Sequence, residues 1–135
     1  MRGILADADC VGQVELLIDL MQDSTRRELY EFLDLRVFLL ADLGLSSDSS
    51  DRVIWERCHD DELVLITANR NADTPDSLQI VIAESATENS LPVITITDPY
   101  RVAHDRHYAH RAADKLLQHL FDIDILRGAV RLYIP

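Results

Sequence analysis

The chain has 135 residues, 47% of them hydrophobic, which is enough to build one core, so we expect a single domain over residues 1–135. The 24 acidic residues outnumber the 13 basic residues, and the formal net charge of −11 repels nucleic acid, anionic membranes and acidic substrates at long range. An enzyme of this composition that acts on nucleic acid therefore needs metal ions or a local basic patch.

The cysteines and the lack of a targeting pattern bear on the compartment. Cys10 and Cys58 stand in a chain without a signal-peptide pattern, which is more typical of a reduced cytoplasmic protein than of a disulfide scaffold. We expect both to be buried thiols. No apolar run approaches the roughly 20 residues that cross a bilayer, so we expect a soluble, cytoplasmic protein with no membrane partner.

Two carboxylates end the first predicted element. The apolar run at residues 3–8 predicts a short buried strand, which carries Asp7 and Asp9 at its carboxyl end. Over residues 11–22 the apolar side chains recur at helical spacing, and this pattern predicts an amphipathic helix. Every inference about function from this sequence depends on these two aspartates.

A second helix and a second strand follow. Ser24 can cap this helix, which carries Leu29, Phe32 and Leu33 on one side and charged residues on the other. The helix leads into an apolar run at residues 37–40, which predicts a buried strand.

The middle of the chain predicts a loop, a helix and a central strand. The serine-rich residues 46–50 predict the loop, and Ser50 can cap a helix that continues through Cys58. The acidic residues 60–62 are unfavourable at a helix C-terminus, so we expect them to shorten this helix. Residues 63–67 form a continuous β-branched and leucine run, which predicts a central strand.

The last third continues the alternation. The Thr-Pro dipeptide at residues 74–75 signals the start of a helix whose apolar face includes Ile82. Residues 93–97 predict a strand, residues 104–119 one long helix, and residues 130–134 a final strand. Strands that alternate with helices over short loops predict an α/β fold with a mainly parallel sheet of about five strands, covered on both faces.

A parallel sheet brings the carboxyl ends of its strands to one edge. Oxygen-rich side chains gather at this predicted edge: Asp7, Asp9, Asp51, Asn69, Asn71 and Asp98. Mg²⁺ and Mn²⁺ take oxygen ligands, often one or two carboxylates together with waters, so the cluster is a candidate metal site. The alternative is that these residues are helix caps and turn formers, which are common in loops.

Three segments, taken in order, resemble the small bacterial PIN-like proteins: ILADAD at residues 4–9, LADLGLSSDSSDRVIWERC at 40–58 and LVLITANRN at 63–71. In that branch a strand ends in Asp-Glu-Asn, a later loop runs from Leu-Gly-Leu to Ser-Asp before a helix, and a strand ends Thr-x-Asp-x-Asp-Phe. The resemblance covers about the first half of the chain.

The resemblance implies a three-layer α/β sandwich and a metal-dependent ribonuclease, often the toxin of a toxin and antitoxin pair. Asp7 matches the first family aspartate and Asp51 the aspartate that opens the middle helix, while Asp9 stands where the family has Asn. Asn69 and Asn71 occupy both aspartate positions of the last motif. Asp7, Asp9 and Asp51 are thus the expected catalytic metal ligands, with Asn69 completing the site.

These changes predict a weakened metal site. The amide oxygens of Asn69 and Asn71 are neutral, and metal affinity falls as the site loses charge. Asp73 or Asp98 could restore a charge from a loop. Asn71 and Arg70 are the expected substrate-binding residues, because Arg70 follows the central strand directly and can hold phosphate.

Other basic and aromatic side chains are candidates for the same roles. The remaining candidate phosphate contacts are Arg26, Arg27, Arg101, Arg106 and Arg111. Tyr100 and Tyr108 are the aromatic side chains on which bases could stack, and a structural role is the favoured alternative for both. The histidines at 104, 107 and 110 invite a transition-metal site, but steps of three turn around a helix, so a polar helix face is the better interpretation. Tyr30 and Trp55 are expected in the core or on a self-association surface.

Two functions of different class follow. One is a Mg²⁺- or Mn²⁺-dependent ribonuclease acting on single-stranded RNA. The other is a catalytically inactive PIN-like module that works through protein contacts, with an antitoxin or another protein as partner; a homodimer is expected in either case. A receiver-like or flavodoxin-like domain is the rival fold, but the predicted central strand ends without the aspartate that a receiver phosphorylates, and Lys115 is the only lysine.

Overall fold

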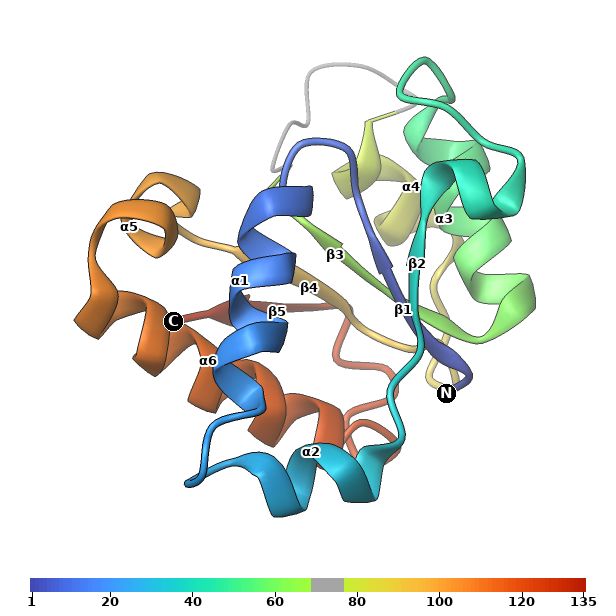
Figure 1. Cartoon of the computed structure of the whole chain (residues 1–135). Coiled ribbons are helices and arrows are strands. Elements are labelled where there is room, and N and C mark those ends of the chain that lie inside the picture. The colour runs from blue at the N-terminus through green and yellow to red at the C-terminus, as the bar shows by residue number, and fades with distance from the viewer. Residues whose placement is uncertain (69–76) are drawn as a thin grey trace.

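The structure, a computed structural model, describes residues 1–68 and 77–135 (Figure 1). The strands in these residues are β1 (Gly3–Ala6), β2 (Val37–Leu39), β3 (Leu63–Thr67), β4 (Val93–Ile96) and β5 (Arg131–Ile134). The α-helices are α1 (Val11–Met21), α2 (Arg27–Leu33), α3 (Asp51–Asp61), α4 (Leu78–Ser85), α5 (Pro99–His104) and α6 (Arg106–Phe121), and η1 (Leu40–Leu43) is a 3-10 helix. No helix in the described ranges is long and apolar enough to cross a membrane.

The strands form one sheet in the order β2-β1-β3-β4-β5, and every neighbouring pair is parallel. Successive side chains of a strand point to opposite faces, and the core is divided accordingly. On one face Ile4 packs with α1 and α6 in a cluster that includes Leu17 and Leu116. On the other face Leu5 packs with α3 and α4 in a cluster that includes Ile54 and Val81. The predicted α/β class and mainly parallel five-stranded sheet are confirmed.

The strands differ in burial according to their place in the sheet. Residues 63–67 form β3, which lies between β1 and β4 with all five residues buried, as expected for a central strand. The prediction that residues 37–40 form a buried strand is wrong. β2 pairs only with β1 and therefore lies at an edge, where Val37 is 40% exposed and Leu39 is 38% exposed.

Several helix ends differ from the predicted ones. Ser24 does not cap α2; instead, the Asp23 carboxylate accepts the backbone N–H groups of Thr25 and Arg26 just before that helix. The acidic residues do not shorten α3, which runs to Asp61. The dipeptide at 74–75 lies outside the described residues, and α4 is described from Leu78.

The single helix predicted at residues 104–119 is two helices. Asp105 lies between α5 and α6 with an extended backbone, and its carboxylate accepts the backbone N–H of Tyr108. An aspartate at this position satisfies one of the N–H groups that a helix start leaves without a partner, so it favours a new helix over a continued one.

The strand order places a reversal between β1 and β3. From β1 the chain moves to β2 on one side, then returns to β3 on the other. This is also the strand order of flavodoxin-like and receiver-like sheets, the rival fold of the sequence analysis. The residue that a receiver phosphorylates is still missing, because β3 ends at Thr67 and not at an aspartate. In such sheets ligands bind outside the carboxyl ends of the strands where the order reverses. The carboxyl ends of β1 and β3 are thus the place to look for a site.

Candidate functional site

Asp7 lies at the carboxyl end of β1, held against β3. Its backbone N–H donates to the Ile66 carbonyl oxygen at 2.9 Å, which continues the pairing of the two strands by one residue. The hydroxyl of Thr67, the last residue of β3, donates to Asp7 Oδ2 at 2.9 Å, and the Ala8 N–H donates to Asp7 Oδ1 at 2.8 Å. The Asp7 carboxylate is therefore fixed in position by both strands.

Asp9 lies beside it. The Ala68 N–H donates to Asp9 Oδ1 at 3.2 Å, and Asp9 Oδ2 lies 3.5 Å from the same Thr67 hydroxyl oxygen that serves Asp7. The structure thus brings the two aspartates of the first predicted strand to one hydroxyl group at the β1–β3 reversal. We call Asp7 and Asp9 the carboxylate pair.

Asp51 approaches from α3 but is tied to another helix. Its Oδ2 accepts the Leu78 N–H at 2.9 Å and so joins the start of α3 to the start of α4. The charge of Asp51 still reaches Asp7, since it contributes to raising the pKa of Asp7, as the weakest of the causes that act. Among the described residues, no three His, Cys, Asp or Glu side chains are grouped so that they could hold a metal ion.

The surroundings of Asp7 raise the pKa of its carboxyl. Burial raises the pKa of the Asp7 carboxyl above its ordinary value, and the neighbouring charge of Asp9 raises it further. The hydrogen bonds from Thr67 and Ala8 act in the opposite direction without cancelling the effect. A positive ion next to the carboxylate pair would relieve this repulsion.

The donor set of the pair suits a hard divalent cation. Each carboxylate oxygen has two lone pairs, so an oxygen that accepts one hydrogen bond retains a site for a metal. Mg²⁺ is usually held by one or two carboxylates and completes its shell with water. Asp7 and Asp9 could hold such an ion, and Asp51 could join after releasing the Leu78 N–H.

Other predicted site residues fall elsewhere. Asn69, Arg70, Asn71 and Asp73 lie outside the described residues. Asp98 accepts the Arg101 N–H at 3.0 Å and acts as the N-cap of α5.

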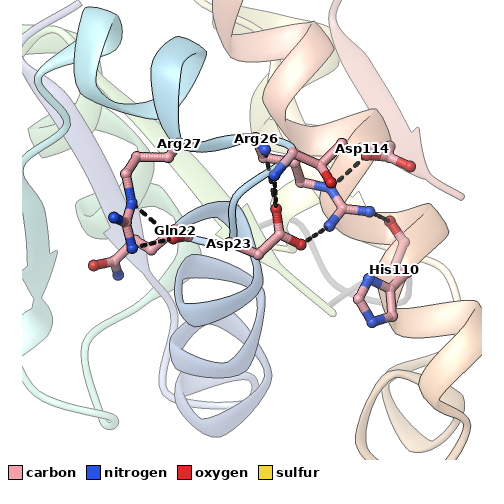
Figure 2. Close-up of polar contacts among 7 residues, drawn as sticks. Gln22, Asp23, Arg26, Arg27, His110 and Asp114 are labelled. Atoms are coloured by element: carbon pink, nitrogen blue, oxygen red, sulfur yellow. Dashed lines mark hydrogen bonds and ion pairs between the residues drawn. The ribbon is translucent and has the colours of Figure 1, made fainter.

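Two of the candidate phosphate contacts are committed to the fold. Figure 2 shows the guanidinium of Arg26 between the carboxylates of Asp23 and Asp114, and only 10% of its side chain is exposed. Arg27 donates to the Gln22 carbonyl oxygen at 3.0 and 3.1 Å. These contacts fix the segment between α1 and α2.

Three aromatic residues of α2 and α3 differ in their burial. Trp55 is 5% exposed and stacks on His59, and Tyr30 is partly buried. Phe32, on the apolar side of α2, is 74% exposed. Its ring lies 6.0 Å from that of Phe121, which is 50% exposed, over a groove of about 480 Å³. The helical spacing of apolar residues in α2 did not reveal this aromatic pair, because Phe121 comes from a different helix.

A second hollow adjoins the carboxylate pair. It has a volume of about 330 Å³, and Ala8, which lies between the two aspartates, is in its wall. The other lining residues come from β1, α1, the end of β2 and the segment after it: Ala6, Val11, Leu39, Leu40, Ala41, Leu45, Ser46 and Ser47. The carboxylate pair therefore stands beside a largely apolar depression.

Comparison of the chain with protein-family models, with curated proteins and with solved structures finds no significant match. The site is thus interpreted from its own residues.

Proposed function

We propose that this chain is a PIN-like protein that binds Mg²⁺ or Mn²⁺ at Asp7 and Asp9 and slowly hydrolyses single-stranded RNA, as a ribonuclease of the toxin type. The observation that carries the proposal is the position of the carboxylate pair at one hydroxyl, on the edge of the sheet where the strand order reverses. The motif resemblance in the first half of the chain supports it.

Different residues would serve different steps of the proposed hydrolysis. A bound divalent ion would activate a water molecule and neutralise phosphate charge. Asp7 and Asp9 would hold that ion, and the Thr67 hydroxyl keeps the Asp7 carboxylate in its orientation. Asn69 would complete the site, with Arg70 and Asn71 on the substrate. Because two family carboxylates are replaced by neutral amides, we expect low metal affinity and slow turnover.

The test is Mn²⁺ titration by calorimetry together with cleavage of labelled single-stranded RNA. Asp7→Asn should weaken Mn²⁺ binding at least about tenfold and remove cleavage, because it deletes a charge from the pair. Asp60→Asn is the matched control, since Asp60 is an exposed aspartate at the other end of α3, about 14 Å along the helix from Asp51. Absence of binding at millimolar Mn²⁺ would refute the ribonuclease.

A catalytically inactive module that works through protein contacts is the second candidate. It is favoured by the exposed Phe32 and Phe121 pair on α2 and α6, because contiguous exposed apolar surface often marks a protein interface. A homodimer is the first association to test, and an antitoxin or another protein is the next. In sedimentation velocity, Phe32→Ser should shift a dimer toward monomer. Val53→Ser, which alters a 45% exposed residue on the opposite face, should not.

A further inference from the structure

Positive charge is concentrated in one short part of this acidic chain. Residues 101–115 hold four of the 13 basic residues and three of the five histidines. Several of these side chains are exposed where α5 meets α6. We call four of them the α5–α6 surface: Tyr100, Arg101, His104 and Arg111.

Tyr108 organises the two arginines of this surface. Its ring is buried, and the guanidinium carbons of Arg101 and Arg111 lie 4.2 and 5.7 Å from its centroid. One guanidinium comes from α5 and the other from α6, so two positive charges contact the same ring. Arg101 also forms an ion pair with Asp105 at 3.2 Å, yet half of its side chain stays exposed.

An aromatic pair lies on the same short helix. The rings of Tyr100 and His104 are 4.2 Å apart, one helical turn from each other on α5, and Tyr100 is 71% exposed. Exposed aromatic rings beside arginines are the elements that single-stranded nucleic acid needs, since bases stack on the rings and phosphates bind the guanidinium groups.

This surface lies at the same edge of the sheet as the carboxylate pair. α5 begins where β4 ends, and β4 is two strands from β1, or roughly 10 Å. The Gln13 side chain donates to the Pro99 carbonyl oxygen at 3.4 Å and ties the first turn of α1 to the start of α5. Figure 1 shows α5 beside the beginning of α1.

We propose that the α5–α6 surface holds single-stranded RNA next to the carboxylate pair, an inference that rests on the ribonuclease function proposed above. The arginines contact the phosphates and Tyr100 stacks on a base. Because the whole chain repels RNA, the attraction is local and strongly weakened by salt.

Binding is measured without divalent ions, so that it is separate from catalysis. A fluorescein-labelled oligouridylate of about ten nucleotides is titrated in EDTA and followed by fluorescence anisotropy. Two phosphate contacts predict a slope of about −1.4 for the logarithm of the association constant against that of the salt concentration. Arg101→Gln with Arg111→Gln should lower affinity at least about tenfold at about 50 mM salt and flatten the slope.

Arg27→Gln with Arg36→Gln is the charge-matched control. It also removes two positive charges from exposed arginines, but on α2 and just before β2, away from α5. This control should bind as the wild type does. Tyr100→Leu should weaken binding by about fivefold or more and leave the salt slope unchanged, because it removes stacking and no charge. Circular dichroism checks that each variant is folded.

Three results would contradict the proposal that this surface binds RNA. They are no binding by the wild type at about 100 µM protein, equal loss in the two double variants, and displacement of the oligonucleotide by polyglutamate as readily as by unlabelled RNA, which would indicate an acidic protein ligand. Failure of the proposed ribonuclease function would look different from failure of the RNA-binding surface. Mn²⁺ binding and RNA cleavage would then be absent, but the wild type and Asp7→Asn would both still bind the oligonucleotide in EDTA.

Discussion

The Nε–H of Arg26 donates to the Asp114 carboxylate on α6 at 2.5 Å, across 88 residues of sequence (Figure 2). The same guanidinium donates to Asp23 and, at 3.4 Å, to the His110 carbonyl oxygen. One side chain thus fastens the turn between α1 and α2 to the long C-terminal helix.

Replacing Arg26 should therefore destabilise the fold. Arg26→Met retains much of the apolar stem but removes all three sets of hydrogen bonds, and we expect a loss of about 1–2 kcal/mol in the free energy of unfolding. Urea denaturation followed by circular dichroism measures it. Arg27→Met is the neighbouring control and should cost less, because Arg27 bonds only to the local Gln22 carbonyl oxygen in the contacts described. Equal losses would contradict the role of Arg26.

Gly3 and Gly12 should respond oppositely to a methyl group. A Cβ on Gly3 would lie 2.5 Å from the Arg36 carbonyl oxygen, which accepts the Ile4 N–H, so Gly3→Ala must push β1 from β2 and cost about 1–3 kcal/mol. A Cβ on Gly12, in the first turn of α1, meets nothing within 4 Å, and Gly12→Ala should stabilise by up to about 1 kcal/mol. Thermal unfolding of both variants tests the pair, and a stabilising Gly3→Ala would refute it.

The two thiols should be unreactive in the folded protein. Cys10 and Cys58 are 1% and 3% exposed, as expected from the sequence. Burial raises the pKa of Cys58 to about 12 and also raises the pKa of Cys10, with help from the charge of Asp9. Since the thiolate is the reactive form, Ellman's reagent at about pH 8 should label the native protein at least about a hundredfold more slowly than the unfolded protein. Rapid labelling of either cysteine would contradict this.

The sequence was informative where a local pattern decides the structure. The apolar run at 63–67 has no polar residue before Thr67, which is typical of a strand covered on both faces, and these residues form the central strand. The run at 37–40 looks similar, but β2 lies at the edge. Local composition does not say how many neighbours a strand has, so its exposure could not be predicted.

In the candidate site, too, part of the arrangement could be predicted from local sequence and part could not. Two acids directly after an apolar run place Asp7 and Asp9 at the rim of a sheet. Their meeting at Thr67 depends on the register of β1 on β3, in which Ala6 pairs with Ile66, and no short pattern encodes that register. Tyr100 and the arginines around Tyr108 were separate candidates in the sequence. The break at Asp105, which lies between α5 and α6, sets their relative positions.

Glu62 should make stability depend on pH. Both carboxylate oxygens accept hydrogen bonds from Arg127, at 2.8 and 3.3 Å, and this lowers the pKa of Glu62 below its ordinary 4.5. A lowered pKa means that the contribution is complete above the unfolded value and is lost as pH falls through the folded value. The pair is partly exposed, so Glu62→Gln should cost only about 0.5 kcal/mol at pH 7.

Urea denaturation of wild type and Glu62→Gln at several pH values measures this difference. It should be constant from about pH 7 to 5 and shrink toward zero below about pH 4, as Glu62 becomes protonated in the folded wild type as well. Glu31→Gln, which changes an exposed glutamate on α2, is the control and should show no such trend. A difference that grows on acidification would have the wrong sign for a lowered pKa.

The carboxylate pair predicts a conflict between stability and function. Burial and the Asp9 charge both disfavour an ionised Asp7, so at neutral pH the folded protein holds a negative charge that it would hold more easily when unfolded. Asparagine has nearly the same shape and can still accept from Ala8 or Thr67, but it carries no charge. The substitution that harms the proposed metal site should therefore stabilise the empty fold.

Asp7→Asn should raise the midpoint of thermal unfolding by about 2–4 °C in EDTA at pH 7, corresponding to somewhat under 1 kcal/mol for a domain of this size. Asp60→Asn, which removes a charge from an exposed position, should leave the midpoint nearly unchanged. Added Mn²⁺ should then reverse the ranking, because an ion that binds only the folded wild type stabilises it by mass action and gives little to Asp7→Asn. Differential scanning calorimetry with and without Mn²⁺ measures both effects. A lower midpoint for Asp7→Asn in EDTA would mean that the hydrogen bonds to the carboxylate outweigh its repulsion from Asp9.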